Sequence, residues 1–265
     1  MNTYKIFVLS VVQGITELLP ISSSGHLILM GKLLDFDIGG DTLFLSVLHL
    51  GTTLAIIVFY RKTLFKDLFT KKKLTFYLKL LLSSVPAAII GLLFQDYITS
   101  KLHSTVVIAV SLIAVGVLFI LLENLKKKSS KIKLENIPTW KMVVIGVGQS
   151  LALIPGTSRS GITTLTGMSL GLEKYTAFKF SFILGIPILL GSSIYEIILS
   201  YLGSGEPSLF TASMAVLRIS PWVLITFIIG YISLHLVKRF KKSKWLTVFG
   251  VYRILLGLLI LLLAI

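Results

Sequence analysis

The chain has 265 residues, of which 55% are hydrophobic and only 14% are charged, and its mean hydropathy is +0.92. Soluble domains carry about a quarter charged residues, so this composition excludes an ordinary soluble domain and indicates an integral membrane protein. The formal net charge of +15 does not indicate a nucleic-acid partner, because the lysines lie in short connecting loops and not along an aromatic surface. The absence of cysteine excludes disulfides, thiolate metal ligands and a cysteine nucleophile.

Six apolar stretches have about the length of 20 residues that a membrane-spanning helix needs. They are residues 43–60, 76–95, 105–122, 176–199, 221–237 and 245–264. Two further apolar stretches, residues 4–34 and 139–172, are each interrupted by a polar turn rich in serine, proline and glycine. Backbone that leaves the helical path at membrane depth is tolerated only where protein covers it or where it lines a watery cavity. We interpret both as re-entrant helical hairpins; the alternative is that residues 4–19 or 139–154 cross fully.

The distribution of positive charge predicts the orientation of these segments. Lys and Arg gather in three loops, within residues 61–73, 126–133 and 238–244, and such loops are typically cytoplasmic. Alternating the six spans puts all three loops on that side, provided that residues 139–172 enter and leave there. The same rule puts residues 35–42 outside, so residues 4–34 must enter and leave from the outside.

These assignments predict an all-α polytopic membrane protein with one membrane domain, residues 1–265. It contains six transmembrane helices and two re-entrant hairpins, arranged as an inverted-topology repeat of residues 1–125 and 137–265. In such a repeat the shared site is expected near the midplane, where the two hairpin tips meet. Sequence similarity between the halves is limited to the tips and needs a one-residue gap.

The first tip carries a carboxylate, three serines and a histidine. Gln13 and Glu17 are four residues apart and share a helical face, and Pro20 ends that helix. One of the following serines is expected to cap the next half-helix, which begins near Gly25 with His26 in its first turn. These serines are Ser22, Ser23 and Ser24.

The second tip repeats this plan and carries an arginine but no carboxylate. Gln149 and Pro155 precede the turn, and the next half-helix begins near Gly161. Two half-helix N-termini that point at one place offer unpaired N–H groups and positive dipole ends to an anion. Arg159 adds a planar fork of five donors suited to phosphate. We therefore expect a phosphate site, and the apolar surroundings indicate that the phosphate belongs to a lipid.

Glu17 is the only carboxylate deep inside either hairpin, and a buried carboxylate costs several kcal/mol unless it is paired, protonated or bound to a metal. We interpret it as functional; the alternative is a structural ion pair with Arg159 or Arg253. Arg253 itself is either a second phosphate ligand or a structural partner, and the structural role is preferred. His49 is interpreted as a packed histidine that bonds a carbonyl.

At these residues the chain resembles the undecaprenyl-diphosphatase family, also called the bacitracin-resistance proteins. The two signatures of that family are Glu/Gln-x-x-x-Glu leading into Pro-x-Ser-Ser-x-Gly-His, and Pro-Gly-x-Ser-Arg-Ser-Gly. Here they stand at residues 13–17 with 20–26, and at residues 155–161. The first carboxylate position of the family is Gln13 in this chain, which removes one possible metal ligand or base and leaves more of the chemistry to Glu17.

The resemblance implies hydrolysis of a polyprenyl diphosphate to the monophosphate and inorganic phosphate. This reaction would recycle the lipid carrier of cell-wall synthesis and confer bacitracin resistance, in the plasma membrane and at a site open to the extracytoplasmic side. It also implies a divalent cation, Mg²⁺ or Ca²⁺, which we expect Glu17 to hold. The expected catalytic residues are Glu17, Ser23, His26 and Arg159, with Ser22, Ser24, Ser158, Arg159, Ser160 and Thr163 on the phosphates and Gln13, Gln149 and Arg253 in support.

Two alternatives stay open from the sequence. The preferred nucleophile is Ser23, activated by Glu17 or His26, but His26 itself or a water molecule would also serve. An inverted repeat with broken helices is also typical of secondary transporters, so the same midplane site would suit a protein that moves lipid phosphate across the membrane. The expected partners are the diphosphate lipid and membrane lipids, with no nucleic acid. The oligomeric state and the prenyl chain length do not follow from the sequence.

Overall fold

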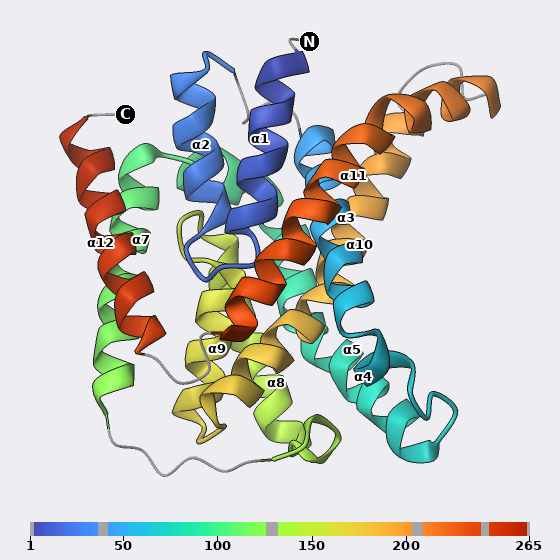
Figure 1. The fold of residues 1–265 in the computed structure, drawn as a ribbon, viewed down its shortest axis with the longest axis vertical. Helices are drawn as coiled ribbons and strands as arrows, with labels where there is room; N and C mark the ends of the chain where they lie inside the picture. Colours follow the sequence, from blue (N-terminus) through green and yellow to red (C-terminus); the bar gives the residue numbers. More distant parts are fainter. Residues whose placement is uncertain (1–2, 37–41, 126–131, 203–208, 240–243, 264–265) are drawn as a thin grey trace.

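The computed structural model describes residues 3–36, 42–125, 132–202, 209–239 and 244–263 (Figure 1). Every regular element in these ranges is a helix, without a strand. The first half contains α1 (Thr3–Thr16), α2 (Ser23–Leu33), α3 (Thr42–Phe59), α4 (Arg61–Phe65), α5 (Lys71–Leu93), α6 (Gln95–Tyr97), η1 (Ile98–Leu102) and α7 (Thr105–Asn124). The second half contains η2 (Leu134–Asn136), α8 (Thr139–Gln149), η3 (Ser150–Leu153), α9 (Arg159–Ser169), α10 (Lys174–Leu202), α11 (Leu209–Arg239) and α12 (Trp245–Leu262).

Five helices in the described ranges are long and apolar enough to cross a membrane. They are α5, α7 and α12 over their whole length, α10 over Lys174–Ser200 and α11 over Ile219–Lys238. The apolar part of α3, Leu43–Phe59, is shorter, and so is α1. Many large apolar side chains of the long helices are exposed, as expected for surfaces that face lipid. The predicted class, an all-α multi-pass membrane protein, is confirmed.

Two helical hairpins, α1 with α2 and α8 with α9, approach the centre of the molecule from opposite ends (Figure 1). Their turns meet there, where the backbone N–H of Gly156 donates to Ser24 Oγ at 3.2 Å. The long helices enclose them: α1 packs on α11 and α8 packs on α5, while α3 lies against α10 and α7 against α12. Each half of the chain therefore contributes one hairpin and packs it against a long helix of the other half.

The two hairpins are built in one register, with equivalent residues 136 positions apart. Helices α2 and α9 both have 11 residues, and each is capped by a serine with positive φ, 72° at Ser22 and 70° at Ser158. The Ser22 hydroxyl accepts from the N–H of Gly25 at 3.4 Å, and Ser158 accepts from Gly161 at 3.3 Å. This register needs no gap. Pro20 and Pro155 are 135 residues apart, so an alignment on the prolines needs the one-residue gap.

The same register extends to the far ends of both hairpins. The Lys5 ammonium donates to the carbonyl of Asp35 at 2.8 Å, just beyond the end of α2. Lys141, which is 136 residues later, donates to the carbonyl of Leu170 at 2.7 Å, just beyond α9. A cation at the C-terminal end of a helix satisfies free carbonyls and complements the helix dipole. Both hairpins thus have a lysine-to-carbonyl contact at the entrance and a serine cap at the tip.

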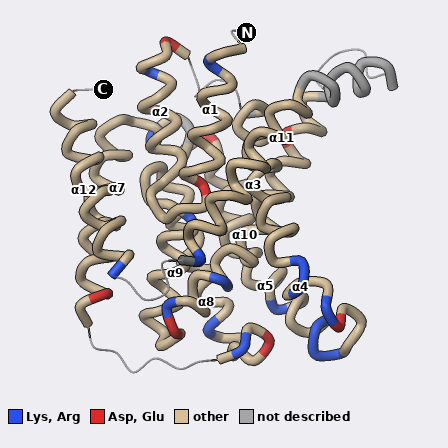
Figure 2. Tube along the Cα trace, viewed as in Figure 1, with Lys and Arg blue, Asp and Glu red and all other residues tan. Residues whose placement is uncertain are grey.

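Lys and Arg gather near α4 and at the starts of α5 and α8, at the end of the molecule away from both termini (Figure 2). The loop within residues 61–73 lies at this end, and its cytoplasmic location stays a prediction from charge. The second hairpin enters from this lysine-rich end, and the first hairpin enters from the opposite end (Figure 1). Residues 126–131 and 240–243, which carry most lysines of the other two loops, lie outside the described residues, as does most of the 35–42 segment.

Candidate active site

Four polar side chains converge on the carboxylate of Glu17, which directly follows α1 and is 8% exposed. Its Oε2 accepts from Ser23 Oγ at 2.5 Å and from Gln13 Nε2 at 3.3 Å, and His49 Nε2 lies 3.6 Å from the same oxygen. Its Oε1 accepts from Arg159 Nη2 at 2.9 Å. The carboxylate is therefore buried with partners on both oxygens, which offsets the cost of removing it from water.

Ser23 is the first residue of α2, and the positive φ of Ser22 turns the chain so that the Ser23 hydroxyl faces back toward α1. A non-glycine residue in this conformation costs about 1–3 kcal/mol and persists only where its surroundings hold it. Here the cap bond of Ser22 to Gly25 and the bond of Ser23 to Glu17 hold it. A hydroxyl within reach of a carboxylate, at a helix N-terminus, has the geometry of an activated nucleophile.

Arg159 occupies the equivalent position in the second hairpin, as the first residue of α9. Its Nη2 reaches Glu17 across the interface between the tips, and its Nη1 donates to the carbonyl of Ser181 at 3.3 Å. A glycine makes room for the guanidinium: a Cβ on Gly185 would lie 1.9 Å from Arg159 Nη1. The repeat thus places a serine and an arginine at matching positions, and both meet at Glu17.

His26 is held away from this cluster. Its Nδ1 lies 2.7 Å from the carbonyl of Ser22, and its Nε2 lies 2.6 Å from the Tyr252 hydroxyl. The two rings also stack, with centroids 5.6 Å apart. A carbonyl only accepts, so Nδ1 carries the proton and Nε2 of the neutral ring accepts from Tyr252. Among the described residues, both ring nitrogens therefore contact groups other than Glu17 and Ser23.

The remaining predicted phosphate ligands bond one another and the turns. Ser22 Oγ lies 3.2 Å from Ser24 Oγ, and the equivalent pair, Ser158 and Ser160, is 3.4 Å apart. Thr163 lies one turn behind Arg159, where its fully buried hydroxyl donates to the Arg159 carbonyl at 2.7 Å. The structure therefore brings the four serines to the tips and leaves Thr163 behind the arginine.

Arg253 ties the two turns together. Its guanidinium is fully buried and donates to the carbonyls of Pro20 at 3.2 Å, Gly156 at 2.7 Å and Thr157 at 3.0 Å. A Cβ on Gly156, whose φ is +92°, would approach the Ile108 carbonyl to 2.5 Å, so this turn is also tightly enclosed. Both Nη atoms of Arg253 donate to the protein backbone, which is the geometry of a structural partner of the hairpins, while its buried Nε has no partner among the described residues.

Two buried glutamines, Gln13 and Gln149, stand at equivalent positions of α1 and α8. Within the described part of the chain, Gln13 Oε1 and both polar atoms of Gln149 have no hydrogen-bond partner. A buried polar atom without a partner costs about 1–3 kcal/mol. The oxygen of Gln13 is next to the carboxylate cluster, where a ligand would satisfy it.

The structure adds His49 and Ser181 to the site. His49 faces Glu17 and its side chain is 28% exposed, whereas the sequence interpretation made it a packed histidine. Ser181 Oγ contacts Thr163 Oγ1 at 2.5 Å, and its carbonyl accepts from Arg159. A histidine inside an apolar span needs a polar partner, and that signal pointed to His49. Ser181 gives no such signal, because serines are common in membrane helices.

These features define a class: a multi-pass helical membrane protein in which two hairpins of equal register bring a serine, a carboxylate and an arginine together. The family model described as Bacitracin resistance protein BacA matches residues 6–259, and the chain belongs to that family.

Similar proteins support the same assignment over almost the whole chain. An undecaprenyl-diphosphatase of Enterococcus faecalis is 37% identical, over 97% of this chain and 95% of the relative. One of Methylobacillus flagellatus is 37% identical, over 97% and 96%. One of Lactiplantibacillus plantarum is 35% identical, over 98% and 97%.

Proposed function

We propose that this chain is an integral-membrane phosphatase that hydrolyses undecaprenyl diphosphate to the monophosphate and inorganic phosphate. Its role would be to recycle the lipid carrier of cell-wall synthesis and to confer resistance to bacitracin. Relatives that match almost the full length carry the name undecaprenyl-diphosphatase. The observation that carries the proposal is the 2.5 Å contact between the Ser23 hydroxyl and Glu17, opposite the guanidinium of Arg159.

In the proposed reaction, Ser23 Oγ attacks the terminal phosphorus and its proton passes to Glu17 Oε2. The bond from this phosphorus to the bridging oxygen breaks, and the lipid monophosphate leaves. Glu17 passes this proton to the departing monophosphate. Water then attacks the phosphorus of the phosphoserine while Glu17 takes a proton from that water; the bond from phosphorus to Ser23 Oγ breaks, inorganic phosphate leaves, and Glu17 returns the proton to Ser23 Oγ. If water is the nucleophile instead, the same oxygen of Glu17 orients it. His26, engaged at both nitrogens, fits the role of fixing the Ser22 turn better than that of a base.

Arg159 is proposed to neutralise the charge that develops on the phosphate oxygens. Its fork supplies several donors in one plane, and the N-termini of α2 and α9 add their positive dipole ends. Phosphoryl transfer depends mainly on such positioning and charge stabilisation. The ion pair with Glu17 keeps the arginine in place and the carboxylate ionised before substrate arrives.

We also propose a divalent cation, for which the donor atoms fit Mg²⁺ better than Ca²⁺. The described residues hold no group of three or more His, Cys, Asp or Glu that could ligate a metal, but Glu17 and the unpartnered Gln13 Oε1 are two adjacent oxygen donors. Mg²⁺ is commonly held by one or two carboxylates plus phosphate oxygens, whereas Ca²⁺ takes six to eight oxygens. When bound, the cation would neutralise charge on the diphosphate.

The membrane arrangement that we propose has six spans and two re-entrant hairpins. At 1.5 Å per residue, α1 and α2 extend only about 21 and 17 Å, well short of the roughly 30 Å hydrocarbon core. The apolar part of α3 is near the lower limit for a span. With the lysine-rich end in the cytoplasm, the first hairpin enters from outside, and the site opens to the extracytoplasmic side.

Phosphate release tests the function directly. Purified protein in detergent should release inorganic phosphate from undecaprenyl diphosphate, and a chelator should stop this release until Mg²⁺ is restored. Absence of release from well-folded protein would contradict the proposal. Movement of lipid phosphate across vesicles without release would select the transporter alternative, which the matched hairpins also suit.

A further inference from the structure

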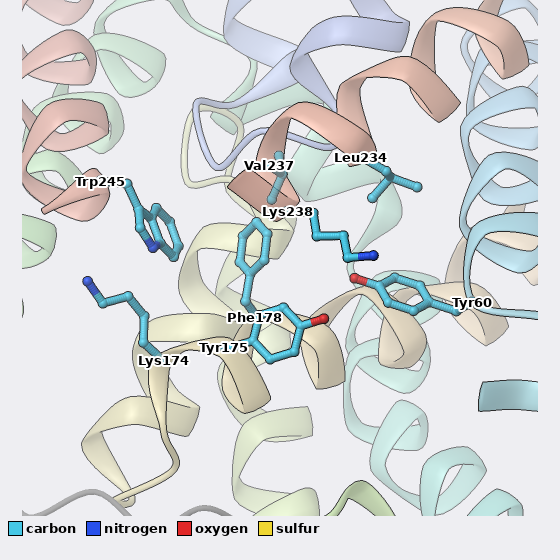
Figure 3. A pocket seen from close by; sticks show the side chains of 8 residues that line it. All are labelled: Tyr60, Lys174, Tyr175, Phe178, Leu234, Val237, Lys238 and Trp245. Carbon is cyan, nitrogen blue, oxygen red and sulfur yellow. The ribbon is translucent and has the colours of Figure 1, made fainter. Parts of the chain in front are cut away.

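A hollow toward the lysine-rich end of the molecule is lined by residues outside both hairpins (Figure 3). It is bounded by the end of α3, the start of α10, the end of α11 and the start of α12. Its enclosed space is small, about 20 Å³, and the hollow is partly open to the outside. The described residues that line it are Tyr60, Lys174, Tyr175, Phe178, Leu234, Val237, Lys238 and Trp245. The site proposed above uses none of these residues.

The lining divides into a polar and an apolar part. Figure 3 shows the Lys238 ammonium and the hydroxyls of Tyr60 and Tyr175 turned toward the same space. Phe178 and Trp245 stand beside them, their rings 4.9 Å apart, and Leu234 and Val237 complete the apolar wall. An ammonium with hydroxyl donors suits an anionic oxygen group, and the apolar wall suits the hydrocarbon that carries it.

The charge of the hollow is positive and part of its wall is fixed. Two of the described lining residues are lysines and none is acidic. Lys174 is held by an ion pair with Glu123 and lies 5.6 Å from the centre of the Trp245 ring. Glu123 in turn accepts from the backbone N–H of Thr247 at 2.6 Å. Lys174 is thus neutralised by its partner, and Lys238 is the other positive charge of the described lining.

A neighbouring hollow extends the positive surface. It is lined by Lys62, Thr63, Lys66, Asp67, Lys73, Lys133, Leu134, Glu135 and Lys179. Lys179 also lies 5.6 Å from the centre of the Tyr60 ring, so it adjoins both hollows. In this second lining one lysine, Lys73, is paired with Glu135 at 3.1 Å. The lysines still outnumber the carboxylates, which favours an anion at this end of the molecule.

We propose that the first hollow binds the phosphate group of an anionic membrane lipid. Basic pockets between transmembrane helices, with Trp and Tyr at the same level, have the chemistry for acidic headgroups. A phosphate monoester carries about −1.5 to −2 charges near neutral pH, enough to engage Lys238 together with the tyrosine hydroxyls. The site differs from the hairpin tips in location and in residues, so it does not depend on the proposed reaction.

Trp245 provides a local readout, because it forms part of the wall. In a Trp140→Phe/Trp222→Phe protein it is the sole remaining tryptophan, since the chain has three. Its emission is followed in detergent while phosphatidic acid, phosphatidylcholine or inorganic phosphate is added. We expect a saturable change with phosphatidic acid and not with phosphatidylcholine. An equal change of emission with inorganic phosphate at the same concentration would show that the hollow binds free phosphate and not a lipid headgroup.

The matched variants are Lys238→Gln and Lys71→Gln, which remove the same charge from the same end of the molecule. Lys238→Gln should raise the half-saturating concentration of phosphatidic acid about fivefold or more. Lys71→Gln, outside the hollow, should leave this concentration unchanged. Tyr60→Phe should raise it without a change of charge. Equal binding by wild type and Lys238→Gln, or an equal response to phosphatidylcholine, would overturn the proposal. Phosphate release by Lys238→Gln should match wild type.

Discussion

The two oxygens of Glu17 have different surroundings, and this division organises the site at the scale of single residues. Oε1 accepts from Arg159, which holds the carboxylate ionised. Oε2 accepts from Ser23 and Gln13 and faces His49, so it is the oxygen that would take a proton from the nucleophile. One carboxylate can therefore hold the arginine in place and act as a base at the same time.

Glu17→Gln should abolish most of the phosphate release. The amide cannot accept on both terminal atoms, so it loses either the bond from Ser23 or the bond from Arg159. Because general base catalysis contributes about 10²–10⁴-fold, we expect a loss of at least about a hundredfold. Phosphate release is measured alongside thermal unfolding of the detergent-solubilised protein. Near-normal turnover by a folded Glu17→Gln protein would show that the carboxylate is only structural.

Arg159→Lys tests whether the planar fork is needed. Arg159 uses Nη2 on Glu17 and Nη1 on the Ser181 carbonyl, and a single ammonium cannot reproduce that spacing. We expect at least about a tenfold lower kcat/KM, since such bidentate contacts combine charge with fixed geometry. An unchanged kcat/KM together with a lower unfolding temperature would assign Arg159 to the structural pair.

Sequence reasoning reached Glu17, Ser23 and Arg159 because a charge or a serine run inside an apolar hairpin is costly without a purpose. It placed His26 among the catalytic residues and interpreted His49 as a packed histidine. His26 shares a tip with Ser23 in the sequence, yet its ring points to Tyr252, while His49 comes from a different helix and faces Glu17. Side-chain direction at a strained turn depends on packing between distant segments, which local spacing does not contain.

At the scale of elements, the equal register of the hairpins explains why the site is asymmetric. Each hairpin has a half-helix that begins directly after a serine cap. The first residue of that half-helix is Ser23 in one hairpin and Arg159 in the other. The first hairpin keeps a small residue there, and the second needs space for a guanidinium, which Gly185 of α10 supplies. The sequence predicted both hairpins but not this complementarity, because it depends on how α10 packs against α9.

Gly185→Ala should impair catalysis without weakening the fold. The added methyl group would lie 1.9 Å from Arg159 Nη1, so the guanidinium must move. Misplacement by about 1 Å can cost about a hundredfold in rate, while alanine favours the helix over glycine. Gly191→Ala on the same helix is the matched control, because no atom of the described residues lies within 4 Å of its added Cβ. Equal phosphate release by both variants would contradict the proposed role of Arg159.

At the scale of the whole molecule, apolar length and lysine distribution were enough to predict the class. The boundaries were less accurate: α10 runs over Lys174–Leu202, slightly beyond the predicted 176–199, and α11 runs over Leu209–Arg239, beginning well before the predicted start at Pro221. A helix can continue past a proline when neighbouring groups satisfy the freed carbonyl, and hydropathy does not contain that information. The orientation of the hairpins stays a prediction from charge.

Single-cysteine labelling tests this orientation, and the natural chain lacks cysteine, so each reporter has no background. Tyr4→Cys and Lys32→Cys, at the two ends of the first hairpin, should react with an impermeant maleimide on intact cells. Lys66→Cys and Lys133→Cys should react only after the membrane is opened, because their lysine-rich end is expected in the cytoplasm. The four positions carry exposed or partly exposed side chains. If α1 spanned the bilayer, Tyr4→Cys and Lys32→Cys would label from opposite sides, and the re-entrant arrangement would be wrong.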